Sequence, residues 1–154
     1  MNQDFRDLLS IFLQENVEFI VVGAHALAAH GHIRATKDLD VWIRPSPENA
    51  RRVRRALAGF GAPISQLSEE DLTTPGLIFQ IGVPPIRIDV LTEVDGLEFT
   101  EAWPDRLSVD IGGLAVPVLS RSHLIMNKKA SGRLQDLADL EALGEGPGKD
   151  HQGR

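Results

Sequence analysis

The segment from Asp38 to Arg44 constrains the fold most, because its side chains alternate strictly between two kinds. Positions 39, 41 and 43 are Leu, Val and Ile, whereas Asp38, Asp40 and Trp42 occupy the positions between them. A period of two is that of a β-strand with one face in the core. The sequence therefore predicts a half-buried strand that presents two carboxylates on its polar face.

The rest of the chain mixes strand and helix patterns without a regular β-α-β repeat. Short apolar or alternating runs predict strands at 17–22, 77–83, 86–92, 107–111 and 114–118. Helical spacing, N-caps and terminal glycines predict helices at 3–15, 24–30, 46–58, 120–131 and 134–143. We expect an α/β fold in which a mixed β-sheet is flanked by helices and followed by a C-terminal helical segment.

Length and composition indicate a small cytoplasmic protein. The 154 residues fit one domain, which we place at 1–143, and the glycine-rich, charged residues 144–154 predict a disordered tail. The chain has no cysteine, which excludes disulfides and thiolate metal sites. Its N-terminus lacks the pattern of a signal peptide, and its longest apolar run, 19–29, is too short to span a bilayer.

The formal net charge is −6, from 22 acidic and 16 basic residues. Proteins that bind duplex DNA through its phosphates usually present a basic face, so this balance argues against general DNA binding. A nucleotide is compatible with it when a bound divalent cation offsets the phosphates. We expect small or local partners and no membrane.

The two carboxylates on the predicted strand are candidate metal ligands. Asp38 and Asp40 point the same way, with their side-chain carbons about 6–7 Å apart. Neighbouring carboxylates repel each other, and Mg²⁺ relieves this repulsion because it prefers carboxylate, water and phosphate oxygens. Asp89, on the polar face of a second predicted strand, can complete a triad. The alternative is an exposed strand edge with solvated aspartates.

Residues before the aspartate pair suit a phosphate. Gly23 and Ala24 lie where a predicted strand enters a helix, and a glycine there lets backbone N–H groups approach an anion. Arg34 and Thr36 just precede the pair, where a cation and a hydroxyl can meet phosphate oxygens. The sequence therefore predicts a metal-assisted site for a phosphorylated ligand.

These segments resemble the nucleotidyltransferase superfamily, and particularly the small bacterial AbiEii-like, or minimal nucleotidyltransferase, group. The resemblance covers residues 5–143. It rests on Gly23 to Ala26, Arg34 to Val41, Arg87 to Val90, and the stretch from Lys128 to Asp139.

The resemblance implies an enzyme that transfers a nucleoside monophosphate from an NTP to an acceptor hydroxyl. Its catalytic residues and metal ligands would be Asp38, Asp40 and Asp89, holding two Mg²⁺ ions, with Mn²⁺ as an alternative. Its nucleotide-binding residues would be Gly23, Ala24, Arg34, Thr36 and Lys128. The acceptor would be RNA such as tRNA, a protein, or a small molecule such as an antibiotic, and a toxin with an antitoxin partner is one such role.

A second hypothesis is a nucleotide- or partner-binding protein that keeps the fold without turnover. Relatives usually have Gly-Ser or Gly-Gly where this chain has Gly23-Ala24, and often Pro and Lys where it has Leu134 and Gln135. Asp136 and Asp139 have helical spacing, which is typical of intrahelical pairing and capping, and we favour that role for Asp139.

Three further features leave alternatives open. Trp42 shares a face with the aspartates and either stacks on a base or packs in the core. The cluster Arg51, Arg52, Arg54 and Arg55 is either a solvated helix face or a docking surface for RNA. His25, His30 and His32 are close in sequence, but their spacing on a helix is poor for zinc, and we favour a place near the phosphate turn for His25 and a capping role for His30.

Overall fold

The computed structural model describes residues 2–31, 38–83 and 86–144. Its helices are α1 (Gln3–Gln14), α2 (Gly23–Ala29), α3 (Pro47–Phe60), α4 (Phe99–Ala102), α5 (Arg121–Ser131) and α6 (Leu134–Ala142), with 3-10 turns η1 (Asp71–Thr73) and η2 (Trp103–Asp105). Its strands are β1 (Phe19–Val22), β2 (Asp38–Ile43), β3 (Ile78–Val83), β4 (Ile86–Leu91), β5 (Leu107–Ile111) and β6 (Leu114–Val118). The predicted site residues Arg34 and Thr36, and the predicted tail beyond Gly144, lie outside the described residues.

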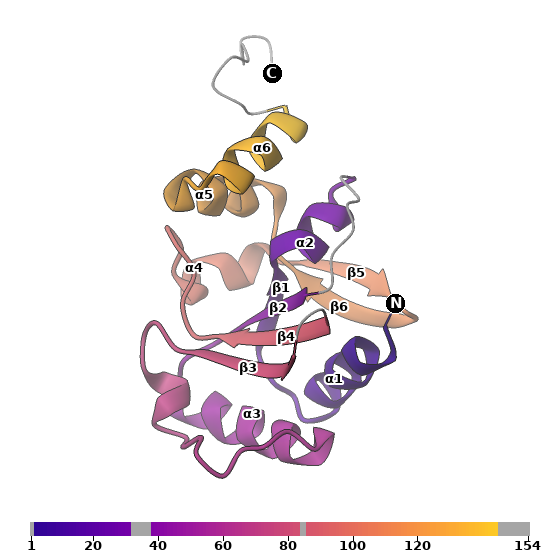
Figure 1. The fold of residues 1–154 in the computed structure, drawn as a ribbon, viewed down its shortest axis with the longest axis vertical. Coiled ribbons are helices and arrows are strands. Elements are labelled where there is room, and N and C mark those ends of the chain that lie inside the picture. The colour runs from indigo at the N-terminus through magenta and orange to yellow at the C-terminus, as the bar shows by residue number, and fades with distance from the viewer. Residues whose placement is uncertain (1, 32–37, 84–85, 145–154) are drawn as a thin grey trace.

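The six strands form one mixed sheet in the order β3-β4-β2-β1-β6-β5. At its centre β1 runs antiparallel to β2 and parallel to β6, while β2 runs parallel to β4. The outer pairs β3–β4 and β5–β6 are antiparallel, as the two predicted hairpins require. The α/β fold with a mixed sheet and flanking helices is confirmed (Figure 1).

The core forms on the apolar side of β2. Leu39, Val41 and Ile43 are completely buried. The same is true of β1, in which only Val22 retains a small exposed fraction of 4%. Helices α1 and α3 pack against one another, and α1 contributes buried Leu and Phe side chains to the same core. Each such side chain stabilises the fold by about 1.5–3 kcal/mol. The apolar alternation of β2 thereby fixes which way its aspartates point.

The other face of β2 is covered only in part. Trp42 is buried and packs edge-on against Phe99 of α4, with ring centroids 5.1 Å apart. Its predicted alternative, stacking on a nucleobase, is therefore wrong, because the indole is already enclosed by the protein. Toward Asp38 the strand becomes more exposed, which leaves the acidic end of this face accessible.

Two predicted boundaries differ for identifiable reasons. The strand β1 begins at Phe19 and not at Val17, because Asn16 has a φ of 57° and the Val17 N–H donates to the Phe12 carbonyl, which closes α1. Helix α3 continues through Gly59, which packs closely against Ile11, and stops at the left-handed Gly61. The short α4, η1 and η2 were not predicted, because so few residues show no period.

Helices α5 and α6 are attached to the loop after β4. Asn127 Nδ2 of α5 donates to the Asp95 carbonyl at 2.9 Å, and a Cβ on Gly96 would come within 2.5 Å of the Ala130 Cβ. In Figure 1 these helices lie near α2 at one end of the long axis, with α3 at the other. Among the described residues, no helix is long and apolar enough to cross a membrane.

Candidate functional site

Four charged side chains gather on the polar face of β2 and β4. The two strands are in register, with Asp40 opposite Asp89 and Asp38 opposite Arg87. Directly paired residues on neighbouring strands point to the same face of a sheet, as do residues two apart on one strand. The structure therefore brings together the three predicted carboxylates, with an arginine at the fourth corner.

Arg87 forms ion pairs with two of these carboxylates. Its Nη2 lies 3.4 Å from Asp38 Oδ2, and its Nε lies 3.1 Å from Asp89 Oδ1. As the side chains lie, no group of three His, Asp or Glu residues within the described ranges is arranged to hold a metal ion. Sequence analysis assigned no role to Arg87, although its alternation with Asp89 placed it on the same face.

Asp40 and Asp89 share an environment that disfavours their charged forms. Burial, followed by the charges of Asp89 and Asp38, raises the pKa of Asp40 to about 6. Burial also raises the pKa of Asp89, and Asp38 adds to this against the opposing charge of Arg87. Crowded carboxylate oxygens of this kind fit a hard divalent cation, whose charge would stabilise both ionised groups.

Gly23 lies directly against Asp40. Its φ is +69°, and a Cβ at this position would overlap Asp40 Oδ2. A glycine is therefore required both for the left-handed backbone and for the approach of the turn to the carboxylate. Gly23 and Ala24 are thus close to the aspartates, where the sequence predicted a phosphate turn.

Two cavities meet at Asp40. One, of about 350 Å³, extends over Asp89 toward Glu93 and Asp95. The other, of about 290 Å³, is lined by Ala24 and Asp38. The residues that line both are Gly23, Asp40, Lys128 and Arg133. The cavity-lining residues for which sequence analysis gave no site role are Ile78, Glu93, Asp95, Asn127, Arg133, Gln135 and Asp136, among others.

Lys128 reaches both cavities, but α6 already neutralises its charge. Its Nζ lies 3.2 Å from Asp136 Oδ1 and 2.8 Å from Asp139 Oδ2, and the residue is 5% exposed. The predicted intrahelical pairing and capping are confirmed, because Asp136 forms a capping box with Arg133 and Asp139 Oδ1 accepts from Gln135 Nε2 at 2.9 Å. Both aspartates also pair with a lysine of the neighbouring helix, which was not predicted. Lys129 is exposed and does not line either cavity.

Asp136 also binds Arg133. Its Oδ2 lies 3.0 Å from Arg133 Nε and accepts from the Arg133 backbone N–H at 3.3 Å. Burial alone would raise the pKa of Asp136, but hydrogen bonds from Ser131, Arg133 and Lys128 and the charge of Lys128 lower it to about 2. Asp136 is therefore ionised at neutral pH and ties two cations to the start of α6.

The other predicted candidates lie away from these cavities. Arg52 binds Glu48 and the Asn16 carbonyl, Arg54 binds the Leu67 carbonyl, and Arg55 pairs with Glu15. Three of the four arginines of this cluster therefore bind groups of the same chain.

The histidines have structural contacts. His30 is the C-cap of α2, as predicted, and its Nε2 also lies 2.8 Å from the Leu119 carbonyl, which links α2 to the start of α5. His25 packs edge-on against Phe5, and burial lowers its pKa. His32 falls outside the described residues.

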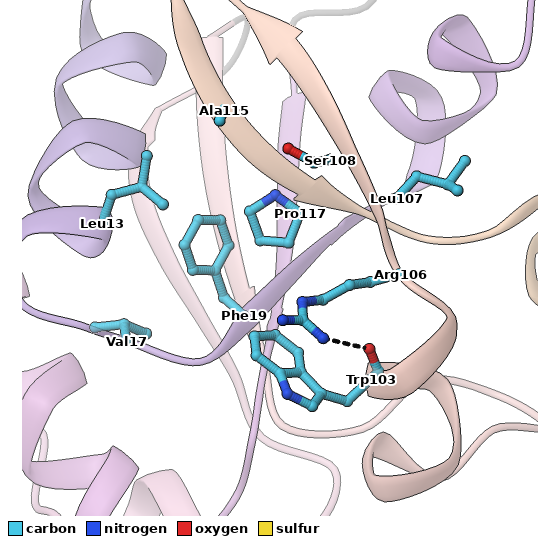
Figure 2. Close-up of a pocket in the computed structure, with 9 residues that line it drawn as sticks. All are labelled: Leu13, Val17, Phe19, Trp103, Arg106, Leu107, Ser108, Ala115 and Pro117. Atoms are coloured by element: carbon cyan, nitrogen blue, oxygen red, sulfur yellow. Dashed lines mark hydrogen bonds between the residues drawn. The ribbon is translucent and has the colours of Figure 1, made fainter.

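A further cavity of about 440 Å³ opens between α1, η2 and the β5–β6 hairpin (Figure 2). Its lining is largely apolar, with Phe19, Pro117 and Trp103 prominent, and the Arg106 guanidinium lies 3.6 Å from the Trp103 ring centroid. No carboxylate lines it. Its chemistry does not suit a metal–triphosphate complex, so the cavities around Asp40 are the better candidate site.

Comparison with known proteins shows the family and the fold. A family described as nucleotidyltransferase of unknown function (DUF6036) matches residues 3–144. The chain belongs to this nucleotidyltransferase family. A crystal structure of a "putative nucleotidyltransferase" from Thermotoga maritima is similar to this chain, with a TM-score of 0.58 and 16% identity over 90% of this chain and 87% of that one. At that identity the likeness shows the fold alone. A search of curated proteins found no match.

Proposed function

We propose that this protein transfers a nucleoside monophosphate from an NTP to an acceptor hydroxyl in a divalent-cation-dependent reaction. The observation that carries the proposal is the in-register pair Asp40 and Asp89, with the Gly23 turn packed against it. Membership of a nucleotidyltransferase family supports the reaction class. Asp38, Asp40 and Asp89 are the proposed catalytic residues.

The charge of the two cavities supports a requirement for metal. Among the described residues, six carboxylates line them, and the cationic residues of their linings are Lys128 and Arg133. A bare triphosphate would be repelled by this balance. Mg²⁺, held by Asp38, Asp40 and Asp89, would neutralise phosphate charge and stabilise the charge that develops on the reacting oxygens. Two ions are predicted, with Mn²⁺ as an alternative.

The two cavities suggest separate places for the substrates. The smaller one includes Ala24 and Asp38, so it suits the triphosphate, together with the predicted Arg34 and Thr36. The larger one includes Asp89, so it suits the acceptor. The acceptor oxygen would bond to the α-phosphorus, the bond from that phosphorus to pyrophosphate would break, and Asp89 would take the hydroxyl proton.

The structure favours a small acceptor over RNA. The α3 arginines, the predicted RNA surface, are largely paired within the chain and lie at the opposite end of the molecule from α5 and α6 (Figure 1). Glu93 and Asp95 make the acceptor side acidic, which disfavours a polyanion. The AbiEii-like grouping and a toxin–antitoxin role stay predictions. They depend on the family resemblance, which includes the stretch from Lys128 to Asp139.

The ion pairs of Arg87 favour the second candidate function, which is nucleotide binding without turnover. Its pairs with Asp38 and Asp89 supply positive charge where the proposed reaction needs a metal ion. A protein with this arrangement could retain a nucleotide and release no pyrophosphate.

Pyrophosphate release distinguishes the two candidates. The protein would be incubated with Mg²⁺, an NTP labelled on the α-phosphate, and either hydroxyl-rich cationic small molecules or bulk tRNA. We expect release of pyrophosphate and labelling of a small acceptor, and loss of both in Asp89→Asn. Labelled tRNA would support the RNA acceptor instead. Tight NTP binding with no pyrophosphate under either condition would favour the non-catalytic candidate.

A further inference from the structure

The proposed function requires a cation for the triphosphate, and Lys128 is poorly placed to be that cation. Its ammonium lies 2.8 and 3.2 Å from two carboxylates, and its side chain is 7% exposed. A ligand phosphate would have to displace one of these buried carboxylates, leaving an uncompensated charge that costs several kcal/mol. The buried lysine therefore suits a structural role.

Arg133 has the opposite character. It lines both cavities beside Asp40, and its side chain is 78% exposed. A guanidinium has five N–H donors in a planar fork that matches phosphate oxygens, and the ion pair with Asp136 engages Nε. Arg133 directly follows Gly132, whose φ is 66°, and therefore lies on the short connection between α5 and α6.

We propose that Arg133 binds the polyphosphate of the nucleotide, and that Lys128 with Asp136 and Asp139 forms the buried support that positions it. This inference rests on the proposed function, because it names a ligand contact within the same site. The phosphate contact thereby falls to a residue for which no role was predicted from the sequence, and Lys128 becomes a positioning residue.

Asp136 connects the buried Lys128 to Arg133, the proposed phosphate contact. One oxygen binds Lys128, and the other binds both Nε and the backbone N–H of Arg133. The carboxylate thereby fixes the start of the arginine side chain and the backbone from which it extends. Less conformational freedom is then lost when the guanidinium binds a phosphate.

The test compares Arg133→Gln with Arg51→Gln, which makes the same change of charge on an exposed position of α3. The affinities for a non-transferable α,β-methylene NTP and for the nucleoside monophosphate are measured by calorimetry with Mg²⁺. Loss of a charge-assisted contact should weaken triphosphate binding about tenfold to hundredfold and weaken the monophosphate less. Arg51→Gln should bind as the wild type does, and Arg133→Lys should be intermediate.

A double-mutant cycle tests the positioning role. Asp136→Asn should weaken triphosphate binding when Arg133 is present and add little in the Arg133→Gln background, because its effect passes through that side chain. Urea denaturation of each variant would show that it is folded under the conditions of the affinity measurement.

The outcomes separate this inference from the proposed function. If the wild type binds no NTP with Mg²⁺, the proposed function fails. If the wild type binds NTP and Arg133→Gln binds it equally well, the function stands and the assignment of Arg133 is overturned.

Discussion

Asp40 carries a half-buried negative charge beside two other carboxylates, and this has a consequence for stability. Its pKa is raised to about 6 in the folded protein, from an ordinary value of 3.8, so the folded state binds the proton more tightly than the unfolded state. The metal-free protein should therefore gain stability as pH falls through 6 and lose it as pH rises.

We predict that Asp40→Asn stabilises the metal-free protein at pH 7.5. The raised pKa corresponds to at most about 3 kcal/mol, reduced by solvent screening. The free energy of unfolding would be measured in urea with a chelator present at pH 7.5 and pH 5. Wild type should become more stable toward pH 5, and the variant should lose this contribution. A variant less stable than wild type at pH 7.5 would show that the carboxylate is well compensated.

Gly23 gives a second prediction at the same scale. Gly23→Ala places a methyl group in the space of Asp40 Oδ2 and also strains a backbone at a φ of +69°. The matched control is Gly31→Ala, where φ is +97° and no atom of the described residues lies within 4 Å of the added Cβ.

Both alanines should cost about 1–2 kcal/mol through backbone strain, as urea unfolding would show. Only Gly23→Ala should also reduce Mg²⁺-dependent nucleotide binding, by tenfold or more, because Asp40 must move. Equal nucleotide affinity of the two variants would mean that the Gly23 turn is not part of the site.

Among the elements, α5 and α6 depend on a lysine between two buried carboxylates. We predict that Lys128→Met destabilises the protein by about 3–5 kcal/mol, since it leaves Asp136 and Asp139 without their cation. Lys129→Met, one residue away and exposed, should change stability by less than about 0.5 kcal/mol. Urea unfolding would compare them, and equal effects would contradict the buried ion network.

The sequence predicted individual elements better than the contacts between them. Alternation was sufficient to find β2 and β4 and to place Asp38 and Asp40 on the polar face of one strand and Asp89 on that of the other, because a strand has a fixed period of two. It could not show that Arg87 pairs with those aspartates, since strand order and register are tertiary properties. It also could not show that Asp136 faces α5, because helical spacing alone favours pairing within one helix.

At the scale of the whole molecule, the arginine-rich α3 lies at the opposite end from α5, whose Lys128 lines both candidate cavities (Figure 1). We therefore predict that Arg51→Glu/Arg55→Glu leaves nucleotide binding and label transfer within about twofold of wild type, as measured in the pyrophosphate assay. Abolished transfer with nucleotide binding retained would instead support an RNA acceptor docked on α3.

The whole-chain likeness fixes the family and fold, while the chemistry depends on a few side chains around Asp40. The measurement that tests this most directly is an equilibrium titration of the metal-free protein with each NTP, with and without Mg²⁺. Wild type would be compared with Asp40→Asn/Asp89→Asn, whose folded state is checked by thermal melting.

We predict that the wild type binds NTP only with Mg²⁺ and that the double variant does not bind it. Nucleotide binding that persists in the double variant or without Mg²⁺, or no binding by the wild type, would contradict the proposal that these carboxylates form a metal–nucleotide site.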